Sequence, residues 1–231
     1  MTSGLDGQTT PPPHRPCPVF EYEIDSSVEV FNVPLSQHIA RQSSSGSQYN
    51  LVANGAIVIV TPVRESQSQL MKDDPSNVEP RAKVLLLQRS QSDSMPTKWE
   101  IPGGGCDDHD PSILYSVARE LWEEAGLKAT RIGPVVGDVN TFHVRRGLVG
   151  KFCFLVQVES TETDEGYPRV TLDPNEHMAY LWATEDEVRD GRVNVDQHTH
   201  VQIPFTNPAF CHVLVDAFRL KRDCDANIPL A

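Results

Sequence analysis

The stretch of sequence that most restricts the fold runs from three consecutive glycines, residues 103–105, to Gly126. Asp110 followed by Pro111 is a good helix start, because aspartate caps free N–H groups and proline suits the first helical position. Gly126 stands where a glycine commonly ends a helix. Between these boundaries apolar residues recur at helical spacing: Leu114, Val117, Ala118, Leu121 and Ala125. The pattern predicts an amphipathic helix that packs against a sheet.

Three glutamates form a second face of this predicted helix. Glu120, Glu123 and Glu124 lie at positions i, i+3 and i+4. Like charges at this spacing repel each other, so the cluster needs a compensating cation or full solvation. Arg119 precedes Glu123 by one helical turn and could neutralise one glutamate. A divalent ion could neutralise the others, and oxygen ligands suit Mg²⁺ or Mn²⁺. The alternative is an acidic face exposed to water.

Apolar runs rich in β-branched residues predict strands on both sides of the helix. Residues 52–60 read VANGAIVIV, as in a strand buried on both faces, and residues 84–88 repeat the signal. Residues 64–81 are polar and contain two prolines, which indicates a long exposed loop. Further strands are expected at 135–141, 148–159 and 178–183, and helices at 34–41, 184–190 (with Thr184 as N-cap) and 208–222. This order predicts an α/β fold with a mixed sheet between helical layers.

The N-terminal part is expected to differ from the rest. Residues 1–18 are rich in proline and polar groups, with too few large apolar residues to offset the entropy of ordering, so we expect a disordered tail. Residues 19–31 alternate β-favouring and polar residues around Ser26 and Ser27, which predicts an edge hairpin. Residues 19–50 would then form an extension, and residues 51–231 one domain that includes the C-terminal helix.

Composition excludes several classes of function. The formal net charge of −12 repels polyanions, so nucleic acid is not an expected partner. No apolar run reaches the length of a membrane span, and the N-terminus lacks the features of a signal peptide, which favours the cytoplasm. The five cysteines are scattered without metal-binding spacing, so we interpret them as reduced thiols.

The window from residue 105 to 127 resembles the sequence box of the Nudix family, G-x5-E-x7-R-E-U-x-E-E-x-G-U with U apolar. Eight of its nine specified positions agree: Gly105, Arg119, Glu120, Leu121, Glu123, Glu124, Gly126 and Leu127. The departure is Pro111, which stands where the first Glu is expected, directly after Asp110. LLLQR at 85–89, WEIPGG at 99–104 and EHMAYLW at 176–182 look like the usual flanks, and the segment before the domain is similar to extensions of fungal members.

The resemblance implies a Nudix-type α/β/α sandwich with a mixed central sheet, and hydrolysis of a diphosphate linkage with Mg²⁺, or Mn²⁺, as cofactor. Glu120 and Glu124 would be the principal metal ligands, and Glu123 would join them directly or through water. The backbone carbonyl of Gly104 would add another oxygen, and Arg119 would orient the glutamates through an ion pair. The missing first Glu weakens the expectation of a normal catalytic rate more than it weakens the expectation of metal binding.

The general base is left open between two positions. Family members use a box glutamate, most often the one that matches Glu120, or a carboxylate from a later loop. Here the loop candidate is Glu176, which could equally be an ordinary loop carboxylate. Its neighbour His177 is expected to hydrogen-bond nearby backbone.

The expected substrate is a small molecule with a diphosphate group. Arg89, Arg146 and Lys151 could hold its distal phosphate or polar head, and glycine at Gly105 allows close approach of backbone to phosphate. Surface solvation is the alternative for at least one of the cations. Four aromatic residues could form a stacking wall or simply pack in the core: Trp99, Phe142, Phe152 and Trp182. Nucleotides, nucleotide sugars and prenyl diphosphates all remain open as substrates.

A second hypothesis is a weak or inactive Nudix domain that binds a ligand as a sensor or regulator. Pro111 is its best support, and the retained glutamates count against it. A homodimer is also conceivable, with the expected N-terminal hairpin pairing strands across a two-fold axis.

Overall fold

The computed structural model describes residues 16–44, 49–62, 81–160, 166–194 and 199–226. Nearly all of the tail expected at residues 1–18, and of the loop expected at 64–81, lies outside these residues.

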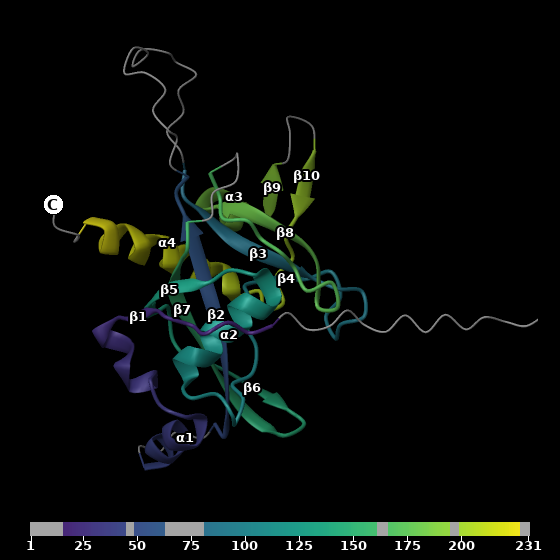
Figure 1. The fold of residues 1–231 in the computed structure, drawn as a ribbon. Coiled ribbons are helices and arrows are strands. Elements are labelled where there is room, and N and C mark those ends of the chain that lie inside the picture. The colour runs from purple at the N-terminus through teal and green to yellow at the C-terminus, as the bar shows by residue number, and fades with distance from the viewer. Residues whose placement is uncertain (1–15, 45–48, 63–80, 161–165, 195–198, 227–231) are drawn as a thin grey trace, which may run out of the picture.

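A mixed eight-stranded sheet forms the centre of the molecule (Figure 1). Its main path is β1-β5-β7-β2-β3-β4, with β6 paired to β7 and β8 paired to β3. β2 runs parallel to β7 and antiparallel to β3. The strands are β1 (Glu23–Ile24), β2 (Leu51–Val60), β3 (Lys83–Arg89), β4 (Trp99–Glu100), β5 (Ala129–Val135), β6 (Asn140–Val144), β7 (Gly147–Val158) and β8 (His177–Thr184). The predicted mixed sheet is confirmed.

Alternate side chains of β2 pack into two different cores, which explains why its sequence is a continuous apolar run. Ala56 and Val58 belong to one buried cluster, and Ile57 and Ile59 belong to the other. Successive side chains of a strand point to opposite faces, so a sheet covered on both faces needs apolar residues at every position.

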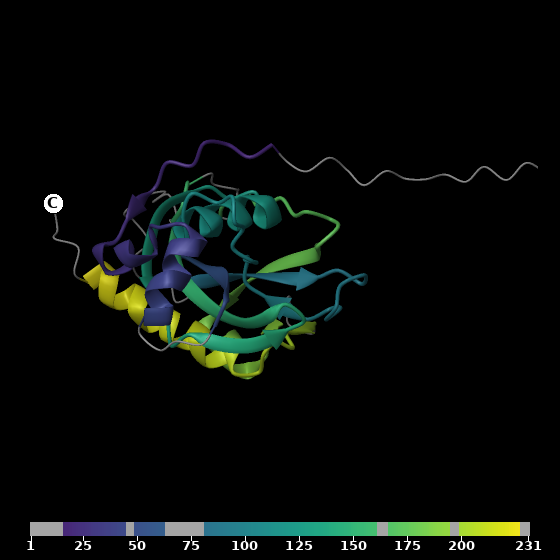
Figure 2. The same ribbon diagram turned by 90° about the horizontal axis from the view of Figure 1, so that it is seen from below.

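Helices cover both faces of the sheet (Figure 2). Helix α2 (Ile113–Ala125), helix α1 (Leu35–Ser44) and the 3₁₀ helix η1 (Ser26–Phe31) contribute to the first core. Helices α3 (Glu185–Asp190) and α4 (Phe210–Ala226) contribute to the second. A separate two-stranded sheet joins β9 (Arg192–Asn194) and β10 (His200–Gln202). The α/β/α sandwich is confirmed, and no helix of the described residues is long and apolar enough to cross a membrane.

The helix termini follow the sequence except at one position. Thr184 caps α3 in a full capping box, and Gly126 ends α2 in the left-handed conformation, with φ 67°. The prediction of Asp110 as the N-cap of α2 is wrong. Ser112 has that role, because its side chain accepts a hydrogen bond from the Tyr115 N–H. Asp110 is engaged elsewhere, by Arg119.

The predicted N-terminal hairpin is also wrong. β1 has two residues and pairs in parallel with β5, and the chain then enters η1. Asp25 starts that helix by accepting hydrogen bonds from the backbone and side chain of Ser27. Val28 and Phe31, three residues apart, then reach the core with exposed fractions of 0% and 8%. The hairpin that suggested a dimer is therefore absent from residues 19–31.

The strand predicted at 135–141 was misplaced. β5 ends at Val135, β6 begins at Asn140, and Gly137 turns the chain between them with φ 70°. Apolar residues continue through this turn, which is why the composition suggested a strand. The other predicted strands and helices within the described residues are confirmed, with boundaries shifted by a few residues at most.

Candidate active site

The turn between β4 and α2 brings the helix against β2, and it requires glycines. Gly103 has φ +148°, and a Cβ there would lie 2.4 Å from the carbonyl oxygen of Asn54. A Cβ on Gly104 would lie 2.8 Å from the carboxylate of Glu120. The carbonyl of Gly104 accepts a hydrogen bond of 2.9 Å from the Asn54 N–H. One of its lone pairs is therefore used, and its role as a metal ligand stays a prediction.

Arg119 forms ion pairs with three carboxylates, those of Asp110, Glu120 and Glu123. We call these four residues the Arg119 cluster. Nη1 of Arg119 lies 2.9 Å from both Glu120 and Glu123, and its Nε and Nη2 lie 3.0 and 2.9 Å from the two oxygens of Asp110. Burial favours the neutral form of Asp110, but the hydrogen bonds with Arg119 outweigh burial and hold the pKa of Asp110 below its ordinary value. The chain itself compensates much of the charge in this cluster.

Glu124 is buried and Glu120 beside it is partly buried, and cations neutralise less of the charge of this pair. Glu124 is 5% exposed, and the Gly103 N–H donates to it at 2.7 Å. Burial, followed by the nearby charge of Glu120, raises the pKa of Glu124 well above its ordinary value. Burial also raises the pKa of Glu120 to about 7, although Arg119 acts against this shift. The charged form of both glutamates is therefore disfavoured in the metal-free chain, and a bound cation would stabilise it.

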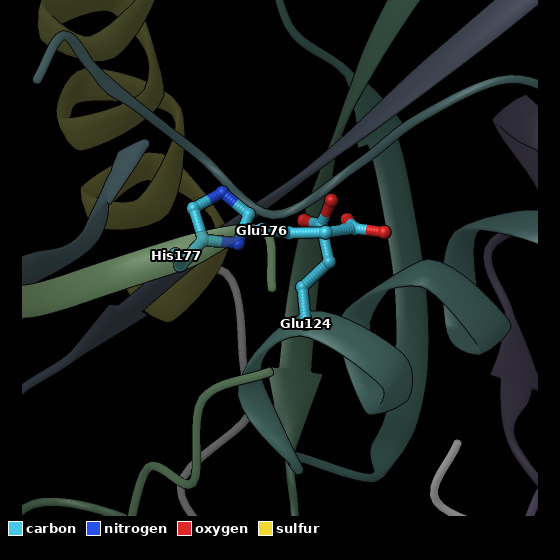
Figure 3. Close-up of side chains that lie close together, drawn as sticks. All are labelled: Glu124, Glu176 and His177. Atoms are coloured by element: carbon cyan, nitrogen blue, oxygen red, sulfur yellow. The ribbon is translucent and has the colours of Figure 1, made fainter. Parts of the chain in front are cut away.

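Glu176 and His177 come from the other side of the site, at the start of β8, and lie close to Glu124 (Figure 3). One ligand atom from each of these three side chains lies within 4.8 Å of the others. Glu176 is exposed, and His177 is 2% exposed. With Glu100, whose carboxylate lies 3.3 Å from Nε2 of His177, they form what we call the Glu124 cluster.

The prediction that His177 hydrogen-bonds nearby backbone is wrong. Its Nε2 contacts a carboxylate, and its Nδ1 has no hydrogen-bond partner among the residues that the structure describes. The reason is tertiary: β4 places Glu100 beside the ring, and no backbone group reaches Nδ1.

Arg89 lies at the end of β3 and forms ion pairs with Glu100 and Asp93 through its two terminal nitrogens. Its side chain also lines the cavity described next. Because both terminal nitrogens already contact carboxylates, contact with a substrate phosphate stays a prediction.

A cavity of about 1030 Å³ opens beside the glycine turn. Its wall includes all four predicted substrate-binding residues: Arg89, Gly105, Arg146 and Lys151. Lys151 lies on β7 opposite Ala53 of β2, and Arg146 lies in the exposed turn between β6 and β7. Nothing lies within 4 Å of the position of a Cβ on Gly105, so space for a phosphate is open there.

The aromatic residues are divided between cavity and core. Phe142 lines the cavity, together with Phe210 of α4, which the sequence had not singled out. Trp99 and Phe152 are buried in the two cores, at 2% and 9% exposed. Trp182 stacks on Tyr167 with ring centroids 5.1 Å apart. The predicted stacking wall is thus limited to Phe142 among the four candidates.

The residues present fit a hard divalent cation. Glu120, Glu123 and Glu124 offer carboxylate oxygens from one helix, and Glu176 adds another from the facing loop. Oxygen donors are the ligands that Mg²⁺ and Mn²⁺ accept. Burial, with neighbouring carboxylates, raises the pKa of Glu120 and of Glu124, so their ionised forms would gain from a bound cation.

Sequence reasoning missed the roles of two carboxylates. Asp110 was interpreted as a cap, although it directly precedes the position where the box expects a glutamate. Glu100 was passed over, although a charged residue between Trp99 and Ile101 in an otherwise apolar strand was a signal of buried pairing.

Comparison with known proteins supports one family. A model of the NUDIX domain matches residues 77–205. An Ap4A hydrolase from C. elegans, solved as a binary complex, is 14% identical with a TM-score of 0.50 over 75% of this chain and 98% of that chain. A MutT protein from Methanosarcina mazei Go1 is 21% identical with a TM-score of 0.46 over 74% and 95% of the two chains. No curated protein sequence matches the chain significantly.

The NUDIX model spans more than half of the 231 residues, and it includes the glycine turn, helix α2 and the start of β8. The site is therefore built from the part of the chain that the family model covers. The chain belongs to the NUDIX family.

Proposed function

We propose that this chain is a pyrophosphohydrolase that uses Mg²⁺, with Mn²⁺ as an alternative, to cleave a diphosphate linkage in a small molecule. Hydrolysis of such linkages is the general chemistry of its family. The observation that carries the proposal is the pair formed by buried Glu124 and partly buried Glu120, both with raised pKa, beside a cavity lined by cations. A metal and a phosphate group would each find opposite charge there.

Glu120 and Glu124 would be the principal ligands of the ion. Glu123, more exposed, would join them directly or through water, and the remaining lone pair of the Gly104 carbonyl is a further candidate. When bound, the ion would neutralise charge on the phosphoryl oxygens and make a water molecule easier to deprotonate. Arg119 holds Glu120 and Glu123 in position through its two contacts of 2.9 Å.

Two carboxylates are candidates for the general base. Glu120 lies at the centre of the site, between Arg119 and Glu124, where it could accept a proton from a nearby water molecule. Glu176 reaches the same site from the loop before β8 and is exposed to water. We propose Glu120 first and Glu176 second.

The substrate would enter the cavity with its phosphates toward the glycine turn. Lys151 and Arg146 could neutralise the distal phosphate, and Gly105 leaves room for it. Arg89 is better placed to hold Glu100 than to bind phosphate, since its terminal nitrogens are occupied. The cavity is large enough for a nucleoside or a prenyl chain, so both classes belong in a substrate test.

The partners and location of the protein are proposed from its sequence. A net charge of −12 disfavours binding to nucleic acid, and we expect a cytoplasmic protein that acts on small molecules. Whether it forms a homodimer stays a prediction, now without the hairpin that first suggested it.

The alternative of a sensor without turnover depends on Pro111. That residue is exposed, and Asp110 beside it already binds Arg119. The ion pair that we would expect from a glutamate at position 111 is therefore supplied by its neighbour, which favours the enzyme.

The test is release of phosphate, with a coupled phosphatase, across a panel of nucleoside di- and triphosphates, ADP-ribose, Ap4A, coenzyme A and prenyl diphosphates, with and without Mg²⁺. We expect metal-dependent turnover of at least one class, lost in Glu124→Gln. If the folded protein binds a compound of the panel but turns over none, the sensor is the better description.

A further inference from the structure

One nitrogen of a buried histidine in the Glu124 cluster is without a partner. Nδ1 of His177 makes no hydrogen bond within the described part of the chain, and the side chain is 2% exposed. Leaving a buried polar atom unsatisfied costs about 1–3 kcal/mol, so such an atom calls for an explanation. The ring lies beside the carboxylates of Glu124 and Glu176, with ligand atoms of all three within 4.8 Å (Figure 3).

The other nitrogen of the ring fixes its tautomer. Nε2 lies 3.3 Å from a carboxylate oxygen of Glu100. An ionised carboxylate can accept a hydrogen bond but cannot donate one, so Nε2 carries the proton and donates. Glu100 is itself held by an ion pair with Arg89, and Arg89 by a second ion pair with Asp93. In the neutral ring, Nδ1 is then left with its lone pair free.

This arrangement is the one that metal-binding histidines commonly have. Their second N–H usually donates to a carboxylate or carbonyl, which fixes the orientation of the ring and makes the ligating nitrogen more basic. Here the supporting chain from Asp93 through Arg89 and Glu100 leads to one side of the ring, and the carboxylates of Glu124 and Glu176 also lie beside the ring.

We propose that Nδ1 of His177 is a ligand of a divalent cation that Glu124 and Glu176 also bind, so that the site offers nitrogen as well as oxygen. The inference rests on the proposed function in that it concerns the same ion. It goes further by naming a ligand outside the helix and by restricting the choice of metal.

The chemical consequence is a metal preference. Mg²⁺ prefers oxygen ligands and dehydrates reluctantly, whereas Mn²⁺, which also binds oxygen, accepts an imidazole nitrogen more readily than Mg²⁺ does, and Co²⁺ and Zn²⁺ more readily still. We therefore expect the chain to bind Mn²⁺ more tightly than Mg²⁺. Loss of the imidazole should weaken Mn²⁺ binding about 10- to 100-fold, a range typical of disturbed metal sites, and should weaken Mg²⁺ binding less.

The experiment uses the whole chain, stripped of metal and loaded with one equivalent of Mn²⁺. Pulsed EPR detects coupling between Mn²⁺ and a ligating ¹⁴N, and the wild-type protein should show it. Protein grown with ¹⁵N-histidine should show the ¹⁵N pattern instead, which assigns the nitrogen to a histidine without any mutation.

His177→Gln identifies the residue, because the glutamine amide can still donate to Glu100 but offers no imidazole nitrogen. The matched control is His200→Gln, which changes an exposed histidine on β10. We expect the nitrogen coupling and the tight Mn²⁺ affinity to be lost in His177→Gln and kept in His200→Gln, with both affinities measured by calorimetry.

Three results would overturn the inference: bound Mn²⁺ without nitrogen coupling in the wild type, coupling that persists in His177→Gln, or no Mn²⁺ binding at all. Turnover is measured separately with the substrate panel. An active enzyme without nitrogen coupling removes this inference alone, whereas nitrogen coupling without turnover supports the ligand and removes the proposed hydrolysis.

Discussion

The Arg119 cluster and the Glu124 cluster share one helix but solve the problem of buried negative charge in opposite ways. In the first, a single guanidinium contacts Asp110, Glu120 and Glu123 at 2.9–3.0 Å. In the second, burial raises the pKa of Glu124, and the Gly103 N–H, rather than a cation, donates to its carboxylate. Glu120 lies between them, in contact with Arg119 and yet with a raised pKa.

The difference in how the charge is neutralised distinguishes residues that hold the site in shape from residues that take part in its chemistry. Where the chain supplies its own cation, a charged cluster can hold the glycine turn and helix in place whether or not a metal is bound. Where a buried carboxylate such as that of Glu124 lies near other carboxylates and accepts only from a backbone N–H, folding stores an unfavourable interaction that binding of a metal would relieve. We therefore assign Asp110 and Arg119 to positioning, and Glu124, with Glu120 at the border between the two clusters, to the metal.

The largest effect is expected for Glu124→Gln. The amide keeps an oxygen that can accept from the Gly103 N–H but removes the buried charge. We expect kcat to fall by about 10³-fold, because charge stabilisation by the ion is worth several kcal/mol. The metal-free variant should at the same time be more stable than the wild type at pH 7.5, as found where function requires strain. Lower stability together with full activity would contradict the assignment.

The next largest effect is expected for Arg119→Met, measured by urea denaturation of the metal-free protein. Removing the guanidinium leaves Asp110, 7% exposed, without its cation. Breaking a buried ion pair from one side costs about 3 kcal/mol or more. Arg131→Met, which removes a more exposed arginine from Asp25 and Glu23, is the matched control and should cost less than about 1 kcal/mol. Equal losses of stability in the two variants would mean that Arg119 stabilises the fold no more than the more exposed Arg131 does.

The contrast between the clusters also shows what a single sequence can predict. Helix α2 and β2 were predicted because their signals are local: apolar spacing, a terminal glycine and a β-branched run. The pairing of His177 with Glu100 joins residues 77 positions apart, and a single sequence does not show which partner a buried charge will have. Asp110 was misjudged for the opposite reason, since a local rule for helix caps was applied to a residue that a tertiary contact had engaged.

A smaller effect is expected from pH. The folded protein keeps a proton on Glu120 up to a pKa of about 7, whereas the unfolded chain releases it near the ordinary value of 4.5. Between these values the folded state binds more protons, so the free energy of unfolding of metal-free protein should fall as pH rises, by roughly 2 kcal/mol. Glu124 acts in the same direction.

Urea denaturation in EDTA at pH 5 and pH 7.5 measures this fall, and Glu120→Gln should flatten it. Mn²⁺ or Mg²⁺ added at pH 7.5 should restore the lost stability. A stability that rises between pH 5 and pH 7.5 without metal would mean that the two glutamates are compensated in a way that the structure does not show.

The smallest effect is expected for Glu123→Gln, the counterpart of Glu124→Gln on the same helix. The Glu123 side chain is 38% exposed, and its ion pair with Arg119 is one of several that this arginine makes. The stability change should stay within about 0.5 kcal/mol, as for other exposed pairs. Because water can replace an exposed ligand, kcat should fall less than about 10-fold. The two variants differ only in which cluster loses a charge, so a loss of kcat at Glu123 as large as that at Glu124 would show that the metal is bound by both clusters alike.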